Sequence, residues 1–298
     1  MKQQKLKVAI FGGSGFVGRN IVEQLDTRYE LLAPTRQELN LLEEKSVQSF
    51  LAKATPDVVI HAVNIGGTRK DKDTELIFFN NLQMFFNVVR AKCYYKKLIF
   101  LGSGAEYDKR NPLIKVKETD FGKSIPADYY GLYKYICSTV IAGLDGAVSL
   151  RIFGLYGKYE DYSIKFISNT ICKSIFNIPI VINQNVFFEY VYIDDFINIL
   201  QHFIDHTPKH KFYNIGTGEK VELKTLAKII NNLAEKKQNI SLRKKSLSKE
   251  YTCDTKLLKT EISNFRFTPV EVAIRKLYSY YEENKLKLDK QRLLDDHI

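Results

Sequence analysis

The chain has 298 residues, 45% of them hydrophobic, and a formal net charge of +11 at pH 7. This length and composition exclude intrinsic disorder, and no apolar run is long enough to cross a membrane, so we expect a cytoplasmic protein without membrane contact. The positive charge is spread along the chain, and its densest cluster, Arg243–Lys245, has no interleaved aromatic residues, so we expect no nucleic-acid partner.

The first predicted element is a buried strand over Val8–Phe11, which a glycine-rich turn and a helical pattern follow. Glycine permits the tight turn and lets the backbone approach a pyrophosphate, and the first-turn amides of the helix then hold the anion. Because strand, glycine turn and helix are the context that a dinucleotide fingerprint needs, we predict a cofactor site here. Its expected residues are Gly12, Ser14, Gly15, Phe16, Val17 and Gly18.

Further strands are predicted over residues 31–33, 58–60, 98–101 and 148–152, and a long helical pattern covers residues 74–95. This alternation indicates an α/β fold with a Rossmann-type, doubly wound parallel sheet that helices cover on both faces. In such sheets ligands bind outside the carboxyl ends of the strands. Those ends carry Arg36, Ala62, Val63, Ser103 and Phe153.

After residue 153 the regular alternation ends. Helical patterns appear near residues 165–176, 193–204, 223–236 and 270–281, with strand-like pieces at 186–192 and 212–215. We therefore expect a dinucleotide-binding domain over residues 1–153, to which residues 190–215 return. A smaller, interleaved substrate-binding domain would consist of residues 154–189 and 216–298. The four cysteines are scattered without metal-ligand spacing, so we expect buried thiols and no metal site.

Tyr130 and Lys134 are four residues apart, which on a helix places both side chains on one face. An ammonium beside a phenol lowers the pKa of that phenol, which can then exchange a proton with a carbonyl or hydroxyl group near neutral pH. Ser103 follows the fourth predicted strand, where its hydroxyl would hold a substrate oxygen beside Tyr130. The spacing alone is weak support in a chain rich in Tyr and Lys, but the position of the pair between the fourth and fifth strands favours catalysis.

The glycine motif, Ser103, Tyr130 and Lys134 occur in one order at suitable intervals. In this the chain resembles the extended short-chain dehydrogenase/reductase family of nucleotide-sugar epimerases, dehydratases and reductases, and the resemblance covers nearly the whole chain. The resemblance implies a catalytic triad of Ser103, Tyr130 and Lys134, with Lys134 also binding the nicotinamide ribose. Residues 35–41 resemble the corresponding segment of GDP-fucose synthase, which adds Asn40 and Leu41 to the expected cofactor site.

The family resemblance also implies a further cofactor residue, a dimer and a site for the substrate diphosphate. The family resemblance places Leu155, after the fifth strand, at the cofactor. It also implies a homodimer formed through a four-helix interface, for which the apolar faces near Leu82–Ala91 and Tyr130–Ile141 are suited. An arginine that often binds the substrate diphosphate is replaced near its usual place by Phe188, so Lys165 or Lys173 would hold that group, although both are equally interpretable as solvated helix charges.

The residues after Ser103 narrow the reaction. Sugar dehydratases of this family carry an acidic pair there, whereas this chain has Gly104 and Ala105, so elimination of water is not expected. GDP-fucose synthase has a cysteine at the position of Ala105, and alanine cannot move a proton, so double epimerisation is not expected either. The predicted substrate site therefore comprises Ser103, Gly104, Ala105, Tyr130 and Lys165.

The residues at the end of the second predicted strand indicate which nicotinamide cofactor the protein prefers. NAD enzymes of this type usually carry an acidic residue there for the ribose hydroxyls, whereas this chain has Arg36, whose charge suits a 2′-phosphate. NADP(H) is therefore favoured over NAD(H), unless Arg36 is only a surface charge.

The sequence as a whole predicts NADPH-dependent reduction of a nucleoside-diphosphate-linked keto-sugar, expected at carbon 4 of a 6-deoxy sugar, for deoxysugar or polysaccharide synthesis. Two alternatives stay open, a 4-epimerase with tightly bound NAD and a non-catalytic dinucleotide sensor.

Overall fold

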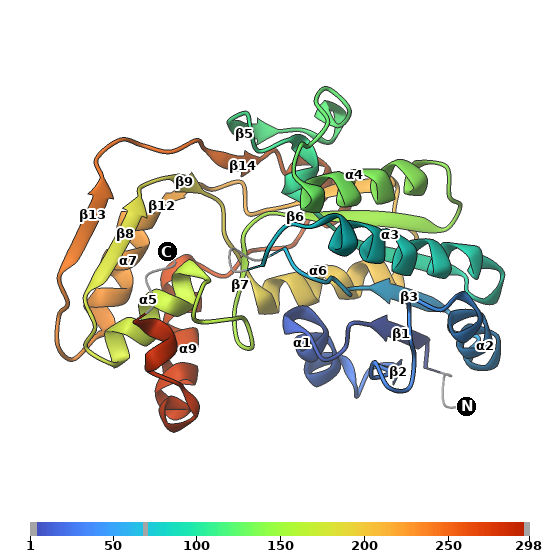
Figure 1. The fold of residues 1–298 in the computed structure, drawn as a ribbon, viewed down its shortest axis with the longest axis horizontal. Coiled ribbons are helices and arrows are strands. Elements are labelled where there is room, and N and C mark those ends of the chain that lie inside the picture. The colour runs from blue at the N-terminus through green and yellow to red at the C-terminus, as the bar shows by residue number, and fades with distance from the viewer. Residues whose placement is uncertain (1–4, 68–70, 295–298) are drawn as a thin grey trace.

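Six parallel strands form the central sheet of the structure, a computed structural model that describes residues 5–67 and 71–294 (Figure 1). Their spatial order is β11-β6-β4-β3-β1-β2, so the chain reverses direction across the sheet after β2. The strands are β1 (Lys7–Phe11), β2 (Glu30–Leu32), β3 (Val58–His61), β4 (Lys97–Ser103), β6 (Ala147–Ile152) and β11 (Phe212–Ile215).

Helices cover both faces of this sheet. Along β1, Val8 and Ile10 pack in the hydrophobic core with α1 and α6, whereas Ala9 and Phe11 pack in the opposite core with α2, α3 and α4. Successive residues of a strand point to opposite faces, so an unbroken apolar strand requires such a double covering. The helices are α1 (Phe16–Leu25), α2 (Glu44–Ala54), α3 (Glu75–Arg90), α4 (Tyr129–Ala142) and α6 (Ile193–Asp205). The expected doubly wound α/β fold is confirmed.

The register of the sheet brings the strand ends that carry the predicted site residues to one edge. Phe11 pairs with His61, and His61 pairs with Phe100, so β1, β3 and β4 are level there. Strand β4 continues beyond this level to Ser103, which pairs with Ile152 at the end of β6. The carboxyl edge therefore presents the glycine turn after β1 and Ser103 after β4 on the same side of the molecule.

The remaining elements form smaller sheets and a second group of helices, of which β8, β13, α5, α7 and α9 lie at the left of Figure 1 and β5 lies at its top. One four-stranded sheet has the order β12-β9-β14-β5, and two further pairs are β8 with β13 and β7 with β10. These strands are β5 (Leu113–Val116), β7 (Leu155–Tyr156), β8 (Ile180–Gln184), β9 (Phe187–Phe188), β10 (Val191–Tyr192), β12 (Val221–Glu222), β13 (Ile240–Lys244) and β14 (Tyr251–Cys253).

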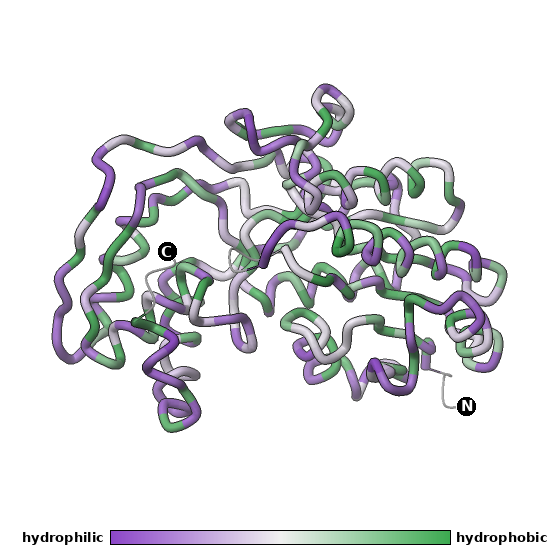
Figure 2. Tube along the Cα trace, viewed as in Figure 1, coloured by the Kyte–Doolittle hydropathy of each residue, from purple (hydrophilic) through white to green (hydrophobic). Residues whose placement is uncertain are grey.

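The helices of this second group are α5 (Phe166–Ile175), α7 (Leu223–Leu233), α8 (Lys256–Glu261) and α9 (Val270–Glu283). Hydrophobic and hydrophilic residues alternate along the outer helices, as a helix with one buried face requires (Figure 2). Short 3₁₀ turns complete the fold at η1 (Lys92–Tyr94), η2 (Gly104–Tyr107), η3 (Glu118–Asp120), η4 (Lys285–Lys287) and η5 (Gln291–Leu293). No helix among the described residues has the length and hydropathy of a membrane span.

Two predicted elements are divided in the structure. The strand expected over residues 186–192 splits into β9 and β10 because Glu189 turns inward and accepts a hydrogen bond from the Cys253 amide at 2.9 Å. The helix expected over residues 74–95 ends at Arg90, and the chain continues through η1. Thr74 begins that helix, because its hydroxyl accepts a hydrogen bond from the Ile77 amide at 3.4 Å.

Candidate active site

The glycine turn after β1 leaves no room for side chains at two of its positions. Gly12 has φ +96°, and a Cβ there would lie 2.7 Å from the Val63 amide nitrogen. A Cβ at Gly18 would lie 2.1 Å from the Gly12 carbonyl oxygen, so α1 packs directly on the turn. Gly15 precedes the first residue of α1, and no side chain caps the helix there. The first-turn amides of α1 thus remain available to an anion.

A cavity of about 200 Å³ opens beside this turn. Its lining brings together six of the predicted cofactor residues, namely Gly12, Ser14, Arg36, Asn40, Leu41 and Val63. The other predicted cofactor residues do not line it. Phe153 is fully buried, and its ring lies 4.9 Å from that of Tyr251. Gly15, Phe16, Val17, Gly18, Ala62 and Leu155 stay predictions that rest on their position in the sequence.

Ser103 is held at the end of β4 by a reciprocal capping arrangement. Its hydroxyl oxygen accepts a hydrogen bond from the Ala105 amide at 3.1 Å, and its own amide donates to the Glu106 carboxylate at 2.9 Å. The side chain is 8% exposed, and it lies close enough to Tyr130 to lower the pKa of that phenol. The two hydroxyl groups that the sequence suggested would act together are therefore neighbours.

Tyr130 and Lys134 both lie on α4, but Lys134 does not lower the pKa of Tyr130 as the sequence led us to expect. Burial raises the pKa of Tyr130 above its ordinary value, and the neighbouring Ser103 side chain lowers it by less. The Lys134 ammonium instead donates a 2.6 Å hydrogen bond to the Leu101 carbonyl oxygen. Burial lowers the pKa of Lys134 to about 8.

The neighbouring tyrosines of α4 have other partners. The Tyr129 hydroxyl donates to Glu75 at 3.2 Å on the exposed side of α3. The Tyr133 hydroxyl donates to the Asn64 side chain, in the loop after β3. Tyr130 is therefore the tyrosine of this turn whose pKa the Ser103 side chain lowers.

Tyr251 is a site residue that the sequence analysis missed. Its hydroxyl lies close enough to Ser103 for that side chain to lower its pKa, and its ring stacks on Phe188 with a centroid distance of 4.7 Å. No local pattern could have found it, because β14 pairs with strands that are distant in sequence. Phe188, noted only as the replacement of an expected arginine, forms part of the aromatic wall that positions Tyr251.

The structure brings only some of the predicted substrate residues close to Ser103. A Cβ on Gly104 would lie 2.4 Å from the Tyr251 hydroxyl, so glycine admits that hydroxyl, and Ala105 is buried beside it. Lys165 is exposed immediately before α5, and no described contact joins it to Ser103 or Tyr130. Lys173 is buried, which is a correction to its interpretation as a solvated charge. Among residues 5–67 and 71–294, no group of three or more His, Cys, Asp or Glu side chains is arranged to hold a metal ion.

Residues 8–216 match the sequence model of the NAD dependent epimerase/dehydratase family. The chain belongs to this family. The match includes the glycine turn, Ser103, Tyr130 and Lys134, so the resemblance drawn from these motifs is confirmed.

Two proteins of known activity are similar to this chain in sequence or in structure. GDP-L-colitose synthase of Yersinia pseudotuberculosis is 34% identical over 109 residues, which are 35% of this chain and 35% of that protein. A GDP-mannoheptose C4 reductase of Campylobacter jejuni, solved with NADP bound, superposes with a TM-score of 0.78 and is 22% identical, covering 95% of this chain and 100% of that one.

A UDP-glucose 4-epimerase of Thermotoga maritima, solved with UDP-glucose, superposes with a TM-score of 0.80 at 17% identity, covering 94% of this chain and 100% of that one. Solved proteins with this fold thus include a reductase and an epimerase of nucleotide sugars.

Proposed function

We propose that the protein reduces the ketone of a nucleoside-diphosphate-linked sugar, expected at carbon 4, with NADPH. The observation that carries the proposal is that the Ser103 hydroxyl lies close enough to Tyr130, at the carboxyl edge of the sheet, to lower the pKa of that phenol. Two neighbouring hydroxyl groups at this edge suit a carbonyl oxygen that must be held and protonated. The named activities of the reductase from Campylobacter jejuni and the colitose synthase support the same class of substrate.

The described residues fit a dinucleotide cofactor. The turn at Gly12 and the uncapped first turn of α1 suit a pyrophosphate, and the adjacent cavity of about 200 Å³ suits a nucleoside. Arg36 lines that cavity and no acidic residue does, which supports NADP(H) over NAD(H). NADPH supplies a hydride to the ketone carbon when it is bound.

The residues of the chain would supply the remaining chemistry. Ser103 would donate a hydrogen bond to the ketone oxygen, and Tyr130 would transfer its phenolic proton to that oxygen as negative charge develops on it. The raised pKa of Tyr130 keeps its phenol protonated at neutral pH, which suits an acid. Lys134, anchored on Leu101, would place its ammonium near the nicotinamide ribose.

A screen of nucleoside-diphosphate keto-sugars for NADPH oxidation tests the proposal. We expect turnover with at least one 4-keto sugar and no tightly held cofactor in the purified protein. Stoichiometric NAD released on denaturation, with interconversion of 4-epimers, would instead establish the epimerase. Binding of cofactor without turnover of any nucleotide sugar would favour the sensor.

A homodimer and a cytoplasmic location are parts of the same proposal. The apolar residues Phe85 and Val88 of α3 are buried in the core of their own chain. Leu76 and Phe79, at the start of that helix, are 69% and 60% exposed. These two side chains suit a helix-to-helix contact between copies. Size-exclusion chromatography of Phe79→Glu against the unmodified protein checks it, with a monomer expected only for the variant.

A further inference from the structure

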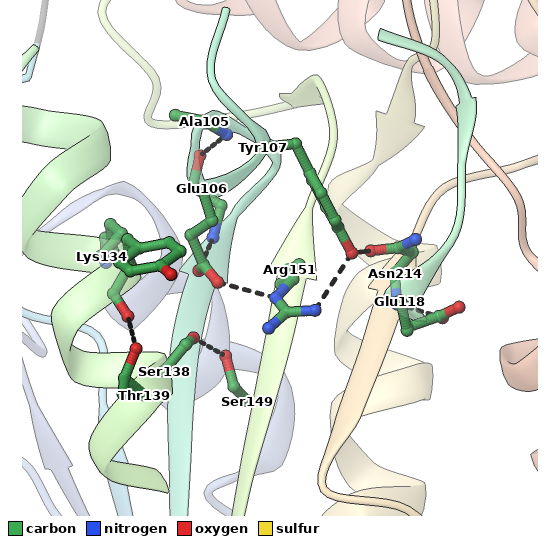
Figure 3. Close-up of polar contacts among 12 residues, drawn as sticks. Ala105, Glu106, Tyr107, Glu118, Lys134, Ser138, Thr139, Ser149, Arg151 and Asn214 are labelled. Carbon is green, nitrogen blue, oxygen red and sulfur yellow. Dashed lines mark hydrogen bonds and ion pairs between the residues drawn. The ribbon is translucent and has the colours of Figure 1, made fainter. Parts of the chain in front are cut away.

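Glu106 is a fully buried carboxylate that points toward Arg151 (Figure 3) and follows Ser103 closely in the chain. One of its oxygens, Oε1, accepts the hydrogen bond of the Ser103 amide at 2.9 Å. A Cβ on Gly102 would lie 2.6 Å from the same oxygen, so only glycine admits the carboxylate at this place in β4. The carboxylate is therefore packed against the backbone that carries the Ser103 hydroxyl.

The second oxygen of Glu106 is fixed by Arg151, which lies on β6. The Arg151 Nε donates to Glu106 Oε2 at 2.7 Å, and both side chains are 0% exposed. The guanidinium lies between two aromatic rings, 4.2 Å from the centroid of Phe121 and 4.5 Å from that of Phe212. These contacts leave the guanidinium little freedom, so they also fix the carboxylate.

A chain of hydrogen bonds continues the network to the edge strand. Arg151 Nη1 donates to the Tyr107 hydroxyl at 3.1 Å, and that hydroxyl donates to Asn214 Oδ1 at 2.7 Å on β11 (Figure 3). The remaining guanidinium nitrogen of Arg151, Nη2, is buried without a partner among the described residues. The network joins η2 to β6 and β11, yet it is not fully satisfied.

Stability alone is a poor explanation of this buried pair. Desolvation of two charges largely offsets their attraction, and apolar side chains of similar volume often stabilise a core as well or better. An unsatisfied buried N–H adds a further cost. What an apolar pair could not do is accept the hydrogen bond of the Ser103 amide and so fix the direction in which the Ser103 hydroxyl points.

We propose that Glu106 is a positioning residue that holds Ser103 in its place beside Tyr130, and that Arg151 in turn orients Glu106. The proposal rests on the proposed function, because Ser103 must contact the ketone oxygen for its position to affect turnover. Neither residue need touch the substrate, since both are fully buried.

The test compares the single variant Glu106→Leu with the double variant Glu106→Leu/Arg151→Met. The single change leaves the Arg151 charge unpaired and should strongly lower the melting temperature, whereas the double change should recover most of that loss. We expect the double variant to keep the wild-type affinity and KM for NADPH but to lose up to about 100-fold in kcat, because Ser103 is displaced. Hydrogen exchange at the Ser103 amide should become faster in both variants.

Glu261→Gln serves as the matched control. Its carboxylate is 4% exposed and accepts a hydrogen bond from Tyr213 at 2.8 Å, far along the chain from Ser103. This variant should lose stability and keep kcat. If the double variant Glu106→Leu/Arg151→Met does not fold, Glu106→Met/Arg151→Leu, which also removes the ion pair and the acceptor of the Ser103 amide, supplies the same kinetic and exchange measurements.

A double variant with recovered stability, wild-type kcat and unchanged exchange at Ser103 would overturn the proposal. If the unmodified protein turns over no keto-sugar, the proposed function fails, and the exchange measurement by itself still decides whether Glu106 holds Ser103.

Discussion

The Tyr251 hydroxyl lies against Gly104, the residue after Ser103, although Tyr251 and Gly104 come from distant parts of the chain: a Cβ on Gly104 would lie 2.4 Å from that hydroxyl. Stacking on Phe188 and contact with Phe153, at centroid distances of 4.7 and 4.9 Å, hold the Tyr251 ring in this position. The Ser103 hydroxyl oxygen accepts a hydrogen bond from the Ala105 amide at 3.1 Å, and the hydroxyl lies close enough to Tyr130 and Tyr251 to lower the pKa of both phenols. The Ser103 hydroxyl has a single proton to donate, so an incoming ketone oxygen competes with these two phenols for it.

Tyr251→Phe tests whether that hydroxyl contributes to turnover. The variant keeps the stacked ring and removes one neutral hydrogen bond, which at about 0.5–1.5 kcal/mol corresponds to a loss of roughly 2- to 12-fold in kcat/KM. Tyr190→Phe is the matched control, because the Tyr190 ring packs 5.0 Å from the same Phe188. Equal kinetics for both variants would show that Tyr251 only fills space.

Tyr130→Phe should abolish most of the activity. It keeps the ring and deletes the proposed acid, so we expect turnover to fall by about 10²–10⁴ while folding and NADPH affinity change little. Tyr129→Phe, which removes only a hydroxyl bonded to Glu75, should cost far less. Steady-state kinetics and cofactor titration of both variants check this, and near-normal turnover of Tyr130→Phe would exclude the assignment.

Arg36→Ala should change cofactor preference. Arg36 lines the cavity beside the glycine turn, where its guanidinium suits a 2′-phosphate. Loss of one charge-assisted hydrogen bond should weaken NADPH binding by roughly 1.5–3 kcal/mol and leave NADH almost unaffected. Fluorescence titration with both cofactors measures the difference, and equal losses for the two would refute the role.

The protein should not dehydrate nucleotide sugars. Gly104 and Ala105 carry no acid or base, and the adjacent carboxylate of Glu106 is ion-paired with Arg151 and fully buried. Incubation with dTDP-, GDP- and CDP-hexoses plus NAD should give no 4-keto-6-deoxy product by mass spectrometry, with an authentic dehydratase as positive control. Formation of that product would require another acid and base at the site.

His61 should make the protein sensitive to acid. It is 1% exposed, neither ring nitrogen has a partner among the described residues, and burial lowers its pKa to about 3. Between pH 6.5 and 3 the unfolded chain binds a proton that the folded chain does not, so the free energy of unfolding falls as the pH falls. The expected loss at pH 5 is about 2 kcal/mol.

His61→Leu should remove this loss, and His210→Gln, at an exposed position, should not. Urea unfolding at pH 7.5 and pH 5 gives the comparison. An identical pH dependence for His61→Leu and the unmodified protein would mean that other groups cause the acid sensitivity.

The sequence by itself determined the glycine turn, the doubly wound sheet and the order of Ser103, Tyr130 and Lys134. These features are local, because hydrophobic periodicity and spacings of three or four residues act within one strand, turn or helix. The sequence could therefore place Tyr130 and Lys134 on one face of α4, but it could not direct the Lys134 ammonium to the Leu101 carbonyl.

Only the tertiary structure decided which side chains surround Ser103. Arg151 reaches Glu106 because β6 pairs with β4, and Tyr251 reaches Ser103 because β14 is held between β9 and β5. Strand order and the docking of the smaller sheets set these contacts, and they leave no periodic trace in the chain. The desolvation of His61 and Lys134 likewise depends on what packs over them, so their pKa values follow from the assembled fold.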